Sequence, residues 1–106
     1  MVIITTRGGD EMITIFKTAE NGLKEVKEYE RDCWVNLSNP TNEEIEELHR
    51  RMNIPLDFLT DPLDIDERSR IEMENKCVLI VIRTPHFNGR DMEIPYITLP
   101  LGIIFA

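Results

Sequence analysis

The spacing of apolar residues changes twice along this chain of 106 residues, and that change restricts the folds it can adopt. Residues 33–37 alternate as in a strand, and residues 12–16, which are mostly apolar, also predict one. Ile45, Leu48 and Met52 then lie three and four residues apart, which is typical of a helix with one apolar stripe. Strand-like patterns return at residue 70. Strands, then helices, then strands predict an α/β (α+β) domain in which a mixed β-sheet packs against helices.

The helical region has a well-marked start. Thr41 and Glu44 have the spacing of a capping box, in which Thr41 caps the helix and Glu44 reaches back to it. A second, shorter helix is predicted to open at residue 53 or 55. It should stop around residues 60–61, because a residue that directly precedes a proline, here Pro62, is disfavoured in the helical conformation.

The strands before the helices are predicted from alternation and from one turn signal. Residues 2–4 give a weak strand signal, and residues 12–16 give a better one. Asn21-Gly22 is a strong hairpin signal. The apolar spacing over residues 23–29 would suit a helix as well as a strand, and we predict a strand because the hairpin dipeptide precedes it. Residues 33–37 form the next predicted strand.

After the helices, the polar residues 64–69 are predicted to form a loop. Residues 70–74 alternate and predict a half-buried strand. Residues 77–82 are apolar at every position, which predicts a central strand covered on both faces. Residues 85–89 are expected to form a turn or longer loop. The last segment, residues 94–106, is expected to form one or two strands interrupted by Pro95, Pro100 and Gly102.

Composition excludes several classes of function. Acidic residues outnumber lysine and arginine by 20 to 12, which gives a formal charge of −8. This balance argues against a nucleic-acid partner and is compatible with cation binding. The longest apolar stretch, residues 99–106, is far shorter than the roughly 18 residues of a membrane-spanning helix. With no signal-peptide pattern at the start, the chain is predicted to be soluble and cytoplasmic.

Carboxylates are concentrated near the end of the second predicted helix. On a helix, Asp57 and Asp61 share a face and repel each other, and a divalent cation would relieve that repulsion. Mg²⁺ needs only one or two protein carboxylates because it keeps several of its waters. Composition alone favours a solvated loop instead. Arg68 and Arg70 follow the cluster and are expected to pair with its acids or to hold the loop. The cluster consists of Asp57, Asp61, Asp64, Asp66 and Glu67.

No catalytic constellation is evident among the remaining residues. His49 and His86 are far apart in sequence, and neither has a cysteine or carboxylate at the spacing of metal ligands. Cys33 and Cys77 fall in predicted buried strands, where a free cysteine behaves as a small apolar residue. Trp34 points away from the apolar side of its strand, toward the helices or another layer. The residues therefore argue against an enzyme.

Several motifs in the right order resemble the CorA family of magnesium and cobalt transporters. Trp34–Ile45 reads WVNLSNPTNEEI, Ile54–Asp64 reads IPLDFLTDPLD and Asp66–Glu72 reads DERSRIE. The apolar residues 77–82 and the sequence PLGIIF at 100–105 continue the match, which covers residues 12–106. The resemblance implies that residues 1–106 are a single partial domain, the cytoplasmic N-terminal regulatory domain of a homopentameric inner-membrane channel. The stalk helix, the membrane helices and their Gly-Met-Asn motif are absent from this sequence, so the domain is expected to be C-terminally truncated.

The same resemblance implies a sensing role for one carboxylate. In the family, Mg²⁺ bound between neighbouring subunits holds the pentamer closed, and the matching ligand here is Asp61. Its partner acid lies on the adjacent subunit's stalk, so Mg²⁺ binding by the isolated chain is expected to be weak. The chain would meet the cytoplasmic face of the membrane only through the missing segments. Two alternatives stay open: an assembly scaffold with no metal role, and a small soluble enzyme, for which we identify no acid-base or nucleophile pair.

Overall fold

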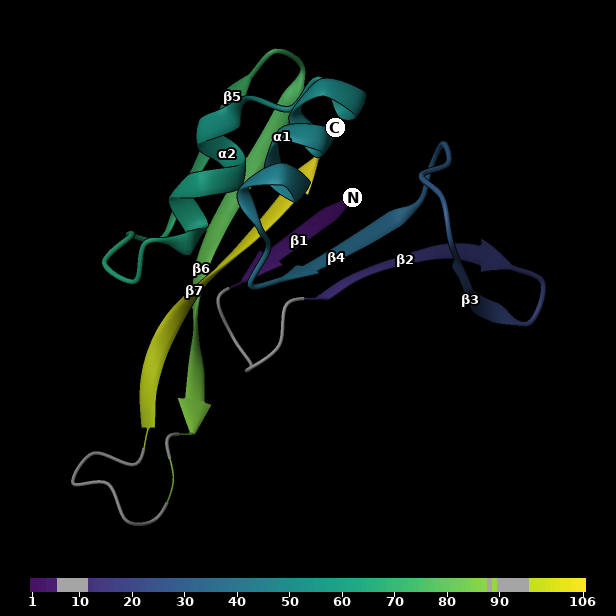
Figure 1. The fold of residues 1–106 in the computed structure, drawn as a ribbon. Coiled ribbons are helices and arrows are strands. Elements are labelled where there is room, and N and C mark those ends of the chain that lie inside the picture. Colours follow the sequence, from purple (N-terminus) through teal and green to yellow (C-terminus); the bar gives the residue numbers. More distant parts are fainter. Residues whose placement is uncertain (6–11, 88, 90–95) are drawn as a thin grey trace.

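The structure, a computed structural model, describes residues 1–5, 12–87, 89 and 96–106, apart from the side chains of residues 12 and 86. These residues form one seven-stranded sheet and a helical segment that lies between β4 and β5 in the sequence (Figure 1). The helical segment comprises α1 (Asn42–Met52), α2 (Leu56–Thr60) and the 3-10 helix η1 (Asp61–Leu63). The strands are β1 (Val2–Thr5), β2 (Met12–Ala19), β3 (Gly22–Val26), β4 (Trp34–Ser38), β5 (Arg70–Glu74), β6 (Cys77–Phe87) and β7 (Tyr96–Phe105).

The sheet is mixed, with strand order β3-β2-β4-β1-β7-β6-β5. The short strand β1 lies at its centre, parallel to β4 on one side and antiparallel to β7 on the other. Val2 is paired with Val35 of β4 and with Ile104 of β7, so the first residues of the chain join its two halves. The predicted fold class, a mixed sheet packed against helices, is therefore confirmed.

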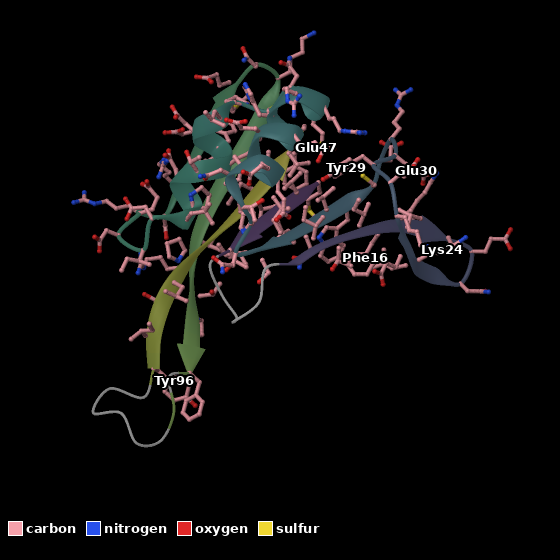
Figure 2. All side chains as sticks on the ribbon, viewed as in Figure 1. Phe16, Lys24, Tyr29, Glu30, Glu47 and Tyr96 are labelled. Atoms are coloured by element: carbon pink, nitrogen blue, oxygen red, sulfur yellow. The ribbon has the colours of Figure 1, made fainter. Side chains whose placement is uncertain are left out.

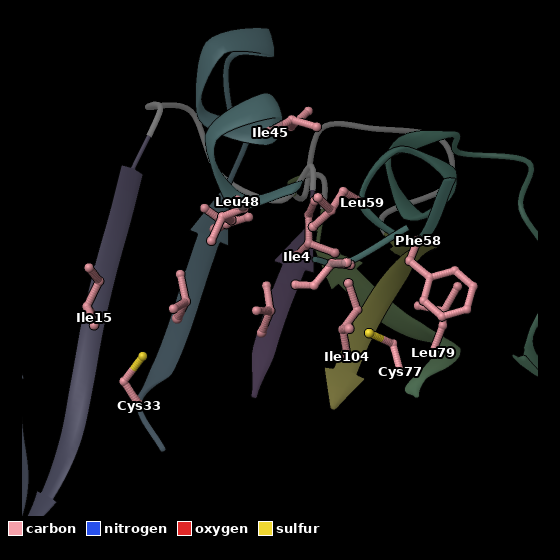
Figure 3. Packing of buried hydrophobic residues seen from close by; sticks show 14 of the residues in the cluster. Ile4, Ile15, Cys33, Ile45, Leu48, Phe58, Leu59, Cys77, Leu79 and Ile104 are labelled. Atoms are coloured by element: carbon pink, nitrogen blue, oxygen red, sulfur yellow. The ribbon is translucent and has the colours of Figure 1, made fainter. Parts of the chain in front are cut away.

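One face of the sheet carries the core. Figure 1 shows α1 and α2 on the same side of the sheet, and Figure 3 shows the apolar side chains that fill the space between them and the strands. Leu48 of α1 and Leu59 of α2 have no exposed surface, and neither does Ile4 beneath them. A fully buried aliphatic side chain contributes about 1.5–3 kcal/mol, so this layer is the main source of stability. The predicted apolar stripe of α1 faces this core.

Among the described residues no helix covers the opposite face of the sheet. Ile71 is 69% exposed and Met73 is 80% exposed there, so β5 is a strand as predicted, but its apolar side is not buried. The prediction that β6 is covered on both faces is also wrong: Leu79 is buried under the helices, whereas Ile82 is 39% exposed on the open face. Trp34 also lies on the open face and not toward the helices, because its neighbours Cys33 and Val35 point into the core.

Two prolines lie inside strands, although one was expected in a turn and the other was expected to interrupt a strand. Pro85 belongs to β6, where it is paired with Thr98, and Pro100 belongs to β7, where it is paired with Arg83. The expected turn at 85–89 is therefore strand as far as Phe87, and β7 runs unbroken from residue 96 to residue 105. Pro95 lies outside the described residues.

The β2–β3 hairpin is confirmed, although its loop consists of Glu20 and Asn21, because Ala19 is paired directly with Gly22. β3 ends at residue 26, earlier than predicted. The connection that follows it packs against α1. There the Arg51 guanidinium lies 5.4 Å from the centre of the Tyr29 ring, and Figure 2 shows this ring beside α1.

The start of α1 is a complete capping box. The Glu44 backbone N–H donates to Thr41 Oγ1, and the Thr41 N–H donates to Glu44 Oε1, each over 3.2 Å. We expect Thr41→Ala to lower the free energy of unfolding by about 1 kcal/mol, because the Glu44 backbone N–H loses its side-chain acceptor. Urea unfolding followed by circular dichroism measures this loss. Thr41→Ser keeps the hydroxyl and should retain most of the stability. Equal losses for the two variants would contradict the capping role.

Candidate functional site

The acidic segment predicted from the sequence runs from α2 through η1 to β5. α2 ends at Thr60, as expected from Pro62, and the chain then tightens into the 3-10 turn η1. Pro62 fits there because the first positions of a helix need no backbone donor. The Asp64 N–H donates to the Asp61 carbonyl oxygen over 3.0 Å and closes the turn. Asp61 thus stands at the junction of two helices, where the backbone is fixed on both sides.

Pro62 anchors this junction to the sheet. Its side chain is fully buried, and it packs over Gly102 of β7. A Cβ atom at position 102 would lie only 2.5 Å from Pro62 Cγ and 2.9 Å from Ile4 Cγ2. The absence of a side chain at Gly102 therefore allows η1 to lie directly on the centre of the sheet, and it fixes the height of Asp61 above it.

Arg70 gathers the carboxylates around this junction. Its Nη2 donates to Asp61 Oδ2 over 2.8 Å, and its Nε donates to Glu72 Oε1 over 3.0 Å. Its Nη1 bonds to Glu67 Oε1 and, over 3.4 Å, to the Arg68 carbonyl oxygen. The Arg70 side chain is 24% exposed and that of Asp61 is 34% exposed, so these ion pairs are partly shielded from water. The predicted pairing of Arg70 with the acids is confirmed.

A second arginine holds the loop from the other side. Arg83 Nη1 donates to the carbonyl oxygens of Ile65, over 3.0 Å, and Glu67, over 2.8 Å. Its Nε and Nη2 both donate to Thr98 of β7, each over 2.9 Å. Arg83 follows the apolar residues of β6, and sequence reasoning gave it no role. Its one sequence signal was a lone cation directly after an apolar strand.

The charges around Asp61 do not balance. Three carboxylates surround one guanidinium, so these four side chains carry a formal charge of −2. The pKa of Asp61 is raised above its ordinary value, chiefly by partial burial and then by repulsion from Glu67, while Arg70 acts in the opposite direction. Because the folded chain holds this proton more tightly than the unfolded chain, ionisation of Asp61 costs stability as the pH rises through its folded pKa. Asp61 is therefore a carboxylate in a fixed position, and the charged group around it has a net negative charge.

The sequence profile of the family described as CorA-like Mg2+ transporter protein matches residues 30–104, which include Asp61, Arg70 and Arg83. The chain belongs to this family. No curated protein sequence matches it.

Two solved structures from Methanocaldococcus jannaschii share the fold of this CorA-like chain. The complete CorA magnesium transporter superposes with a TM-score of 0.70 at 23% identity, over 89% of this chain and 29% of the transporter. The soluble domain of CorA superposes with a TM-score of 0.68, also at 23% identity, over 88% of this chain and 36% of that domain. The chain thus spans about a third of the length of these relatives. Among its described residues, no helix is both long and apolar enough to cross a membrane.

Glu67 is the one acid of the predicted cluster that shares Arg70 with Asp61. Asp57 is exposed on α2, and Asp66 is exposed in the loop, where its N–H donates to Asp64 Oδ1 over 3.0 Å. In the part of the chain that the structure describes, no three histidine, cysteine or acidic side chains are placed to hold a metal ion together.

The remaining candidates have structural roles. His49 Nδ1 lies 2.6 Å from the Ile54 carbonyl oxygen, so this ring helps to join α1 to the start of α2. Cys33 and Cys77 are buried free cysteines in the core, as predicted. Burial raises the pKa of the Cys77 thiol, which keeps it protonated and unreactive. The side chain of His86 lies outside the described residues.

Proposed function

We propose that this CorA-like chain is the cytoplasmic regulatory domain of a divalent-cation (Mg²⁺ or Co²⁺) transport channel, in which Asp61 supplies one half of a Mg²⁺-sensing site between neighbouring subunits. The observation that supports this most directly is the setting of Asp61: a carboxylate fixed on the sheet by Pro62, partly exposed, and surrounded by excess negative charge. The family match supports the transporter context. The membrane-spanning part and the homopentamer would be supplied by the complete transporter, with this domain on the cytoplasmic face of the inner membrane.

The proposed mechanism follows from the charges. Two carboxylates that face each other across a subunit interface repel, and a hard cation between them removes the repulsion and holds the subunits together. When the cytoplasmic Mg²⁺ concentration falls, the cation leaves and the subunits can separate. One carboxylate from each subunit is enough, because Mg²⁺ retains several waters. Binding would therefore be weak in the isolated chain and would strengthen when the subunits assemble.

The test is an Asp61→Asn substitution in the complete transporter that carries this domain. We expect inhibition of transport by cytoplasmic Mg²⁺ to require a concentration at least about 5-fold higher, because the cation loses a charged ligand while the side chain keeps its size. Uptake into cells or proteoliposomes at graded internal Mg²⁺ concentrations measures this shift. Asp57→Asn, an exposed acid one turn earlier, is the matched control and should leave inhibition unchanged.

Two outcomes would contradict the proposal. If Asp61→Asn and Asp57→Asn respond alike to Mg²⁺, then Asp61 is not the sensor. If Asp61→Asn leaves inhibition unchanged while loss of the whole domain prevents assembly of the pentamer, then the domain is a scaffold with no metal role.

A further inference from the structure

Arg70 holds carboxylates from three different parts of the chain. Asp61 belongs to η1, Glu67 to the loop after it, and Glu72 to β5, two residues beyond Arg70 itself. All three nitrogens of the guanidinium are used, one for each carboxylate. An arginine can do this because its donors form a planar fork, whereas the single ammonium of a lysine cannot span three separated acceptors.

Arg70 and Arg83 hold the same loop by different chemistry. Arg83 bonds to the carbonyl oxygens of Ile65 and Glu67 and to Thr98, which are neutral partners. Arg70 bonds mainly to carboxylates, and one of them is Asp61. Loss of either arginine should loosen the loop, but only loss of Arg70 changes the charge next to Asp61. The two residues therefore form a natural pair for comparison.

We propose that Arg70 is a positioning residue that pairs with the Asp61 carboxylate in the absence of a metal ion. A divalent cation that binds this carboxylate then competes with the Arg70 guanidinium for it. This inference rests on the proposed function, because it takes Asp61 to be the ligand. The guanidinium lies 2.8 Å from Asp61 Oδ2, so it already occupies one side of the group to which the cation would bind. Arg70 then orients the carboxylate and also sets the cation concentration at which the site fills.

The size of the competition follows from the charges involved. A Mg²⁺ ion sits about 2.0–2.1 Å from a ligating oxygen, so it would lie within a few ångströms of the guanidinium. Repulsion between a double and a single positive charge at about 5 Å, screened as in water, weakens binding by about tenfold. Removal of the Arg70 charge should therefore tighten Mg²⁺ binding by about the same factor, although it loosens the loop.

The experiment compares Arg70→Gln with Arg83→Gln in the 106-residue chain, with magnesium chloride as the probe and sodium chloride at matched ionic strength as the salt control. Thermal unfolding and the chemical shifts of residues 57–72 are followed during the titration. We expect both variants to unfold at a lower temperature than the parent chain without Mg²⁺. Only Arg70→Gln should bind Mg²⁺ about tenfold more tightly and regain melting temperature as Mg²⁺ is added.

Two further variants keep the inference falsifiable. Arg70→Gln combined with Asp61→Asn should lose the gain in Mg²⁺ affinity, because the ligand itself has been removed. If Arg70→Gln does not fold, Arg70→Met also removes the charge while it keeps an unbranched side chain, and it should bind Mg²⁺ more tightly than the parent by about the same factor. An unchanged Mg²⁺ affinity in the variant that folds, or the same Mg²⁺ response in Arg83→Gln, would overturn the inference.

The two proposals fail in different experiments. If Arg70→Gln tightens Mg²⁺ binding in the isolated chain but Asp61→Asn leaves transport inhibition unchanged, competition at Asp61 holds and the sensing role is wrong. If Asp61→Asn abolishes inhibition but Arg70→Gln leaves the Mg²⁺ affinity unchanged, the sensing role holds and Arg70 only supports the loop.

Discussion

Gly102→Ala is expected to lower the free energy of unfolding by about 1–3 kcal/mol, although it adds only one methyl group. In a β-strand alanine is normally no worse than glycine, so backbone preference does not explain a loss. The cause is space: the new Cβ atom would lie 2.5 Å from Pro62 Cγ and 2.9 Å from Ile4 Cγ2, closer than carbon atoms can approach. Either η1 moves away from the sheet or β7 and β1 shift beneath it. Denaturant unfolding measures the loss, and chemical shifts at Asp61 report whether η1 has moved.

A double-mutant cycle shows whether the Pro62 ring is responsible. Pro62→Ala removes Pro62 Cγ, the atom nearest to the new methyl group, whereas Pro62 Cβ and Ile4 Cγ2, each 2.9 Å away, remain. We therefore expect Gly102→Ala to lower the free energy of unfolding less in the Pro62→Ala background than in the parent chain. The difference should be about 0.5 kcal/mol or more, since residues in contact show coupling of this size. Strictly additive losses would mean that the close approach between β7 and η1 does not limit what position 102 can hold.

The sequence predicted the helices and strands of this fold better than it predicted which of their faces are buried. The Thr41–Glu44 capping box and the spacing of Ile45 and Leu48 are local features, and both the helix and its buried face agree with them. Alternation over residues 70–74 correctly predicted a strand. It shows only that Ile71 and Met73 share a face, and it does not show which face the helices cover. That depends on how distant segments pack, and so the burial of this strand was predicted wrongly.

The pairing of the strands explains why the positions of Pro85 and Pro100 were predicted wrongly. In the described residues β5 pairs with β6 only as far as Val81, so Pro85 has β7 as its one neighbouring strand. Among the described residues, Pro100 pairs with β6 alone, since the described pairs of β1 with β7 begin at Leu101. A proline is tolerated at such edge positions, where one side of the strand has no ladder to interrupt. Strand order decides where these edges fall, and no local pattern encodes it.

Only part of the candidate site could be predicted from the sequence, because some of its residues come together only through strand pairing. Asp61 and Arg70 lie nine residues apart, and the acidic cluster made their pairing a reasonable expectation. Arg83 and Thr98 come from β6 and β7, and only the register of these strands brings them to the loop. Gly102 likewise gains its role from Pro62, forty residues earlier in the chain. The charges of the site are local in sequence, whereas its support is not.

Leu59→Ala is expected to lower the free energy of unfolding by about 2–5 kcal/mol, because it leaves a cavity in the core between α2 and the sheet. Leu59 has no exposed surface, and Figure 3 shows its side chain directed toward Ile4 of β1. Small domains are stable by only about 5–15 kcal/mol in total, so this one change removes a large share. α2 leads directly into η1, and looser packing of α2 should therefore also broaden the amide resonances of Asp61.

Leu56→Ala provides the matched control within the same helix. Leu56 lies three residues earlier in α2 and is 43% exposed, so the same truncation there should cost less than about 1 kcal/mol. Both variants remove the same atoms and change helix propensity equally, and the difference between them isolates the contribution of burial. Urea unfolding of the two chains side by side measures it. Comparable losses would mean that α2 is not held on the sheet by its buried face, and that η1 and Asp61 depend on Pro62 and the arginines alone.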